Sequence, residues 1–210
     1  MATLDMQERE QVNAFKTWWE SNARRIVAAL ISIALILGAA QGWKYYQANK
    51  LAEAGTLYIE LERQMASNDP KRINDAAALI IEKYSQTAYA PRAALLAAQV
   101  NLYVADTAKA RTQLRWVIDH AEEAGLKNVA RLKLASLLLD EKDYAGALAL
   151  LEATPEDAFV GLYADLKGDA LSLQGKTEEA RIAYQQALDR TEAKNAYRNL
   201  IQMKLDGLGK

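Results

Sequence analysis

The sequence of 210 residues contains no cysteine, a single histidine and only three prolines. Without cysteine the chain has no disulfide framework and no thiolate metal site, although this absence does not exclude an oxidising compartment. The scarcity of proline and the abundance of Ala, Leu, Glu, Gln, Lys and Arg favour helix along the whole chain. The predicted fold class is therefore all-α.

A surplus of basic charge is also missing, because 26 Lys and Arg residues stand against 27 Asp and Glu residues. Proteins that hold a nucleic-acid backbone carry clustered positive charge. Here the charges are spread along the chain, which is typical of solvated helix faces with local ion pairs. We expect no nucleic-acid partner, and the length allows one anchor and one domain of about 150 residues.

Sequence motifs of catalysis and cofactor binding are absent as well. There is no nucleophile elbow, phosphate loop or dinucleotide fingerprint, and no histidine pair at metal-ligand spacing. His120 lies on a predicted helix between Trp116 and Glu123, without a convergent carboxylate cluster, which favours a structural or surface role. We expect a protein that is not an enzyme and has no catalytic residue, metal or cofactor.

One long hydrophobic run covers residues 26–43 and holds no formally charged residue. As a helix it spans about 27 Å, close to the bilayer core of about 30 Å. Arg24 and Arg25 flank its start, and an amphipathic belt follows its end, made of Trp43, Lys44, Tyr45 and Tyr46. This pattern predicts a transmembrane helix over residues 24–46.

The distribution of Lys and Arg predicts the orientation of this helix. Before the run stand Arg9, Lys16, Arg24 and Arg25, whereas only Lys44 and Lys50 are close to its other end. Since basic flanks stay in the cytoplasm, residues 1–23 are expected there and residues 47–210 across the membrane. For a bacterium this means a single-pass inner-membrane protein with a periplasmic C-terminal domain.

The hydrophobic run has two alternative interpretations besides a membrane anchor. Small residues at Gly38, Ala39 and Ala40 would suit a cleaved signal peptide, but the long acid-containing N-terminal region and the aromatic belt after the run argue against it. A buried core helix is disfavoured because the run is apolar on all sides. We therefore favour the uncleaved anchor.

Residues 1–23 are expected to form an amphipathic helix. One side of it would carry Leu4, Val12, Phe15, Trp18 and Trp19. Such a helix suits the plane of the lipid headgroups. Docking to a cytoplasmic partner is the functional alternative.

An internal sequence repeat predicts the architecture of the C-terminal part. Small or aromatic residues recur at matching places in three copies. They are Ala97, Ala98, Ala110, Leu114 and Val117; then Leu134, Ala135, Leu138, Tyr144, Ala147 and Leu151; then Gly168, Leu171, Gly175, Ala180, Tyr184 and Ala187. This spacing is that of tetratricopeptide repeats, in which paired helices cross closely where side chains are small.

Local signals predict the ends of these helices. N-terminal ends are expected at Asp69-Pro70, Thr87, Asp106-Thr107, Asp143, Thr154-Pro155, Thr177 and Thr191. Gly125 and Gly175 suit C-terminal ends. A degenerate fourth copy is expected around Ala77 and Ile81, and a last helix over residues 191–205 is expected to cap the stack.

The first helix of each pair lines the ligand-binding side of such repeats, which predicts a protein-binding groove. Its expected residues are Leu95, Gln99, Leu102, Tyr103, Leu132, Ser136 and Leu139. The third repeat would add an acidic, polar face with Asp165 and Asp169. Either hydrophobic segments of other proteins bind in this groove, or the chain's own residues 51–66 fill it.

Three stretches carry a resemblance to a known family: EREQVNAFKTWWESNARR, GWKYY after the hydrophobic run, and KYSQTAYAPRAALLAAQVN. Together with the hydrophobic run they make the chain resemble the YfgM family, the ancillary subunits of the bacterial Sec translocon. The resemblance covers essentially the whole chain. It implies association with the SecYEG channel and the membrane-anchored chaperone PpiD, transfer of secreted proteins to periplasmic chaperones, and a stress-regulatory role for the cytoplasmic segment.

Two other functions stay open. A membrane-tethered repeat domain is also suited to be the structural scaffold of another cell-envelope complex, without binding clients. A cleaved N-terminal segment would instead leave a secreted, soluble binding protein. Residue patterns alone do not choose between these functions.

Overall fold

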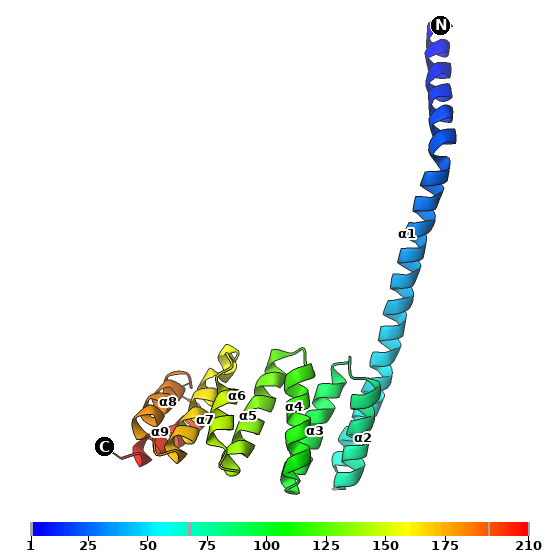
Figure 1. Cartoon of the computed structure of the whole chain (residues 1–210). Coiled ribbons are helices and arrows are strands. Elements are labelled where there is room, and N and C mark those ends of the chain that lie inside the picture. Colours follow the sequence, from blue (N-terminus) through cyan, green and yellow to red (C-terminus); the bar gives the residue numbers. More distant parts are fainter. Residues whose placement is uncertain (1, 67–68, 193, 210) are drawn as a thin grey trace. The chain divides into compact units, whose positions relative to one another are not determined.

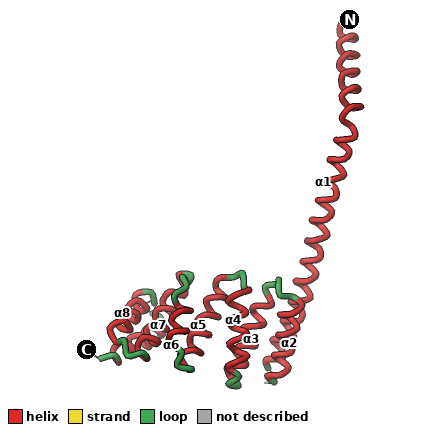
Figure 2. The backbone as a smooth tube through the Cα atoms, in the orientation of Figure 1, coloured by secondary structure: helices red, strands yellow, loops and turns green. Residues whose placement is uncertain are grey.

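The computed structural model describes residues 2–66, 69–192 and 194–209. Within them every element is helical, which confirms the all-α prediction (Figures 1 and 2). The elements are α1 Ala2–Met65, α2 Pro70–Lys83, α3 Tyr89–Tyr103, α4 Thr107–His120, α5 Ala124–Asp140, α6 Tyr144–Leu151, the 3-10 turn η1 Asp157–Phe159, α7 Val160–Leu173, α8 Thr177–Asp189 and α9 Tyr197–Gly207. The chain divides into two compact units, Met1–Lys50 and Leu51–Lys210.

The second unit is a stack of antiparallel helix pairs. Helices α3 and α4, α5 and α6, and α7 and α8 form the three predicted repeats and follow one another along the stack (Figure 1). The degenerate fourth pair exists as well, because residues 51–65 of α1 pack beside α2. Leu61 is fully buried there against Ile73 and Ala77 of α2 and Ala93 of α3.

The turn inside each repeat has the same backbone geometry. Ala105, Lys142 and Gly175 all have positive φ, of 58°, 64° and 75°. In each case the next amide donates to a carbonyl five residues back, as Asp106 N–H does to Asn101 O at 2.8 Å. This is the left-handed backbone conformation at a helix C-terminus, which glycine adopts with the least strain. The predicted end at Gly175 is therefore confirmed, and its two counterparts hold the same turn without glycine.

The paired helices approach closely at the predicted small residues. Ala98 and Ala135 are fully buried, and Gly168 occupies the corresponding place in the third repeat. A Cβ at Gly168 would lie 2.5 Å from ring atoms of Tyr184, which is closer than two carbon atoms can approach. The aromatic ring of Tyr184 thus fills the space that glycine leaves.

Of the expected N-terminal ends, three are confirmed as side-chain caps and Thr177 is the first residue of α8, whereas Thr87 lies two residues before α3 and Thr154-Pro155 precede η1 rather than α7. Two further boundaries are wrong. The carboxylates of Asp69, Asp106 and Asp143 accept hydrogen bonds from the first-turn amides of α2, α4 and α6. Gly125 is the second residue of α5 rather than a helix end. Thr191 does not begin the last helix, because its hydroxyl donates to Ala187 O and closes α8, so α9 starts at Tyr197.

Helix α9 closes the last repeat through a polar network. Lys204 Nζ lies 2.8 Å from Oδ2 of both Asp165 and Asp169 on α7. The Tyr197 hydroxyl donates to Asp165 at 2.5 Å, and the Tyr184 hydroxyl donates to Asp169 at 2.8 Å. Asp165 is 2% exposed. The acidic residues that the sequence predicted as an open part of the groove are therefore paired with Lys204 of the chain's own last helix.

Burial and hydrogen bonding shift the pKa values in this network. Burial lowers the pKa of Lys204, but the hydrogen bonds to Asp165 and Asp169 outweigh it, and the pKa is raised overall. Burial and the carboxylate partners raise the pKa of both Tyr184 and Tyr197. Both hydroxyls consequently stay protonated donors at neutral pH.

Replacing Gly168 by Ala is expected to destabilise the domain by about 1–3 kcal/mol, because the new methyl group would overlap the Tyr184 ring. Urea unfolding followed by circular dichroism measures the loss. Gly207→Ala is the control, since nothing lies within 4 Å of a Cβ there. Equal stability of Gly168→Ala and the control would contradict the close helix crossing.

Replacing Lys204 by Met is expected to cost about 2 kcal/mol or more at pH 7, because Asp165 stays buried without its cation. The pKa of Lys204 is higher in the folded state than in the unfolded state. Its ion pairs therefore stabilise the fold fully below the unfolded-state pKa of about 10.4, and this stabilisation is lost as the pH rises through the folded-state pKa. The difference between the wild type and the variant should therefore shrink above about pH 10. Thermal unfolding across pH, with the exposed Lys167→Met as control, checks this, and a pH-independent difference would be inconsistent with it.

Candidate protein-binding cleft

An apolar cleft of about 570 Å³ opens where the end of α1 and the start of α2 meet the end of α3. One residue of α5 also reaches it. The lining residues are Met65, Pro70, Ile73, Gln99, Val100, Leu102, Tyr103, Val104 and Lys133. All of them belong to the second unit, so the cleft is a property of the repeat domain alone.

The structure brings three of the predicted groove residues together in this cleft. Gln99, Leu102 and Tyr103 all lie on the last turns of α3. Tyr103 is 90% exposed, whereas Leu102 is half-buried and packs on the core beneath. An almost fully exposed tyrosine beside apolar walls is a surface suited to contact another molecule.

The other four predicted groove residues do not line the cleft. Leu95 and Leu132 are half-buried and pack against the central core, and Leu139 is 8% exposed within it. Ser136 is exposed on α5. Repeat numbering assigned these residues to the open side, but leucines at these positions fill the space between successive pairs.

Sequence reasoning missed Met65, Pro70, Ile73, Val100, Val104 and Lys133 as lining residues. The first three belong to the degenerate pair, whose first helix is the end of α1. A signal was present, because Ala54, Leu61 and Met65 recur at helical spacing after the hydrophobic run. The sequence pattern allows residues 51–66 to be a helix that fills the groove, whereas the structure makes them one side of it.

The structure places residues 51–65 beside the cleft rather than over its exposed tyrosine. Their buried residue Leu61 packs against α2 and α3, with Leu57, Tyr58 and Met65 at the edge of the same cluster. The ring of Tyr58 also packs against that of Tyr89 in a tilted arrangement, with 5.4 Å between the ring centroids. Met65 alone of these residues reaches the cleft. The segment therefore forms a wall of the cleft.

Polar side chains behind the cleft fix the helices that form it. Asn101 on α3 exchanges hydrogen bonds of 2.8 Å with Asn74 on α2 and also donates to Gln113 on α4. Gln113 in turn donates to Asn74 at 3.0 Å. Asn101 is 1% exposed, so breaking this triad would leave buried amide groups without partners. The triad thus links α2 and α3, which both line the cleft, to α4.

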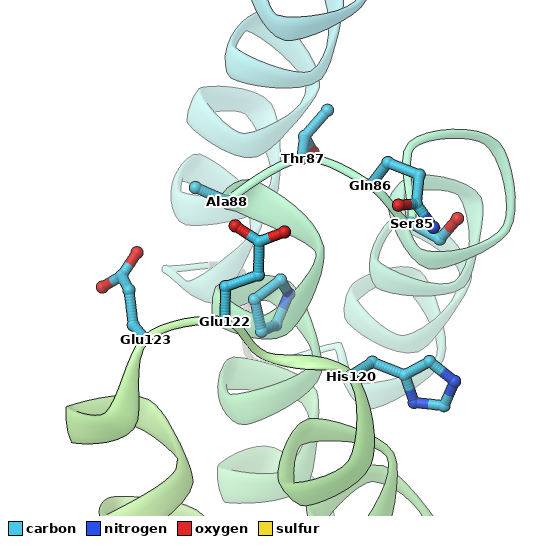
Figure 3. A pocket seen from close by; sticks show the side chains of 8 residues that line it. Ser85, Gln86, Thr87, Ala88, His120, Glu122 and Glu123 are labelled. Atoms are coloured by element: carbon cyan, nitrogen blue, oxygen red, sulfur yellow. The ribbon is translucent and has the colours of Figure 1, made fainter.

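A second, smaller hollow lies at the other end of α3 and has a volume of about 110 Å³ (Figure 3). It is lined by Ser85, Gln86, Thr87, Ala88, Pro91, His120, Glu122 and Glu123. Figure 3 shows the imidazole of His120 pointing away from both carboxylates. The ring stacks on Trp116 at 4.6 Å and its Nδ1 donates to the Trp116 carbonyl, so His120 has the structural role that was expected.

The described part of the first unit, residues 2–50, is helical throughout and carries the apolar run. In the described residues, α1 is the one helix long and apolar enough to cross a membrane. The predicted amphipathic segment continues the same helix without a break, and its side chains before Glu10 lie outside the described residues. Phe15 stacks near Trp18 and Trp19 at ring separations of 6.2 and 6.4 Å. These aromatic residues therefore lie on the same continuous helix as the apolar run.

Comparison with known proteins supports both the fold and the resemblance. Residues 16–210 match the tetratricopeptide repeat-like domain family. Three relatives are named ancillary SecYEG translocon subunit: one from Neisseria gonorrhoeae, 29% identical over 97% of this chain and 98% of the relative; one from Aggregatibacter actinomycetemcomitans, 26% identical over 97% and 98%; and one from Escherichia coli K12, 26% identical over 96% of each.

The family match begins within the N-terminal segment and runs to the end of the chain, and the similarity to the three relatives includes the apolar run. The YfgM-family resemblance that the sequence suggested is therefore confirmed by relatives that are named ancillary SecYEG translocon subunit and match over nearly their whole length. The chain belongs to the tetratricopeptide repeat-like domain family.

Proposed function

We propose that this protein is a membrane-anchored adaptor of the bacterial Sec translocon that binds other proteins through its repeat domain. The observation that carries the proposal is similarity over the full length of both chains to relatives named ancillary SecYEG translocon subunit. Because the similarity includes the anchor as well as the repeats, it concerns the whole arrangement rather than one common module. The cleft beside Tyr103 supplies a surface for binding.

In this proposal α1 crosses the inner membrane once. Trp19 and Trp43 are separated by about 36 Å along the continuous helix, which approaches the full thickness of a bilayer with its headgroups. Arg24 and Arg25 then lie at the cytoplasmic boundary, where their long side chains reach the headgroups. The domains are thus residues 1–23 in the cytoplasm, 24–46 in the membrane and 47–210 in the periplasm.

The proposed role is to assist the transfer of secreted proteins from the channel to periplasmic chaperones, with PpiD as the membrane-anchored chaperone partner. Tethering supports this role physically, since an anchored domain sees a nearby partner at high effective concentration. A modest cleft is then sufficient for repeated capture and release. The relatives are of a non-enzymatic kind, consistent with a role in binding.

The competing function is a structural scaffold for another envelope complex, in which the cleft is a fixed contact rather than a client site. A regulatory role of the cytoplasmic segment is compatible with either function. The exposed group of Phe15, Trp18 and Trp19 is available for it or for the lipid headgroups.

Cysteine labelling in intact cells is expected to show the proposed orientation. The chain has no cysteine of its own, so single cysteines can be introduced at the exposed Glu10 and Glu122. A membrane-impermeant maleimide should label Glu122→Cys once the outer membrane is opened, and Glu10→Cys only after the inner membrane is lysed. The reverse pattern would contradict a cytoplasmic N-terminus, and labelling of both sites before the inner membrane is lysed would contradict a membrane span between them.

A photo-reactive amino acid at Tyr103 is expected to crosslink to translocon subunits or to secretory chains in transit. The same probe at Glu179, which is exposed on α8 away from the cleft, is the control. Products should be identified by mass spectrometry from membranes that are actively secreting. Capture of one fixed envelope complex, unchanged when secretion is blocked, would favour the scaffold instead.

A further inference from the structure

The apolar cleft contains one charged side chain, Lys133 on α5. In the described part of the chain no carboxylate lies within 4.0 Å of its ammonium group. Seven other cations of the domain do have such a partner in the described residues, as Arg92 has in Glu123 and Arg111 in Glu141. Lys133 is half-buried beside apolar walls, where a cation gains more from a partner than it would in open water.

The remaining lining defines the rest of the ligand. Seven of the nine lining residues are apolar or aromatic, and Gln99 adds an amide that both donates and accepts hydrogen bonds. A volume of about 570 Å³ lies in the range that takes a small group of side chains rather than a whole folded element. The chemistry is therefore that of a short apolar segment with a negative charge at one end.

We propose that the cleft binds a segment of a partner protein in which apolar side chains stand next to an acidic residue. The apolar side chains would enter between Met65 and Tyr103, and the carboxylate would pair with Lys133. This inference rests on the proposed function and specifies the chemistry of its partner. Charge complementarity selects the acidic segment, because a basic one would place a second cation beside Lys133.

A protein segment fits these observations better than an anionic lipid. A phosphate group is commonly held by several cations or by an array of backbone amides, whereas the cleft offers one lysine. Gln99 and the hydroxyl of Tyr103 provide hydrogen bonds of the kind that suit a peptide backbone. Lipid binding is accordingly an outcome that the experiment must be able to detect.

The test uses the full-length protein in phosphatidylcholine nanodiscs and two fluorescent peptides with the same leucine-rich core. One peptide carries two glutamates beside the core and the other two lysines. Anisotropy titration is expected to show about threefold tighter binding of the acidic peptide, as for one partly exposed ion pair. In Lys133→Glu the preference should reverse, a swing of about tenfold.

The matched control is Lys127→Glu, which makes the same charge change on the same helix outside the cleft. It should keep the preference of the wild type, and circular dichroism should show both variants folded. Equal binding of the two peptides by wild type and Lys133→Glu, or binding of neither, would overturn the proposal. Displacement of the acidic peptide by phosphatidylglycerol nanodiscs, at concentrations where phosphatidylcholine has no effect, would reassign the cleft to lipid.

These outcomes are separate from the test of the proposed function. Crosslinking from Tyr103 to translocon subunits reports where the protein works, whatever charge its ligand carries. If crosslinking succeeds and the peptides show no charge preference, the adaptor role stands and the acidic-segment inference falls. If the peptides behave as expected but crosslinking finds only a fixed envelope complex, the cleft chemistry stands and the Sec role falls.

Discussion

The close approach of two helices within each repeat is the constraint on which the rest of the domain depends. It requires a small residue at the crossing and a left-handed turn after the first helix. Gly168 meets the first requirement against Tyr184, and Gly175 meets the second. Only when a pair is closed in this way does it present a continuous apolar face for the next pair, because no pair buries enough surface alone. The cleft beside Tyr103 exists because this stacking holds α1, α2 and α3 in place.

Buried polar contacts differ from one junction of the stack to the next. An amide triad centred on Asn101 links α2, α3 and α4, whereas the hydroxyl of Tyr163 on α7 donates to Asn128 on α5 at 3.0 Å. At the last junction Lys204 joins α9 to Asp165. Apolar packing alone would tolerate several registers, but each buried donor has to meet its own acceptor. These contacts therefore favour one order of the helices.

How far the sequence could predict this structure depended on the range of the interaction. Caps such as Asp106 and the turn at Gly175 depend on neighbouring residues in the sequence. The spacing of small and aromatic residues likewise predicts the helix pairs without knowledge of distant contacts. Thr191 was misplaced because its hydroxyl competes for a carbonyl of α8. In the site, Tyr103 was predicted from its repeat position, but the burial of Leu139 and Asp165 depends on helices distant in sequence. Lys133 was missed because only the structure shows that α5 reaches the end of α3.

A shallow cleft and a membrane anchor complement each other energetically. A cleft that accepts a few side chains buries little area, so its intrinsic affinity is low and its complexes dissociate quickly. For a protein that hands on its ligand, fast dissociation is useful, provided that capture stays efficient. Under the proposed function the anchor supplies that condition, because it would confine the domain to the membrane surface, where a segment leaving the channel would be met at high effective concentration. Tighter binding in the cleft would then slow release more than it would improve capture.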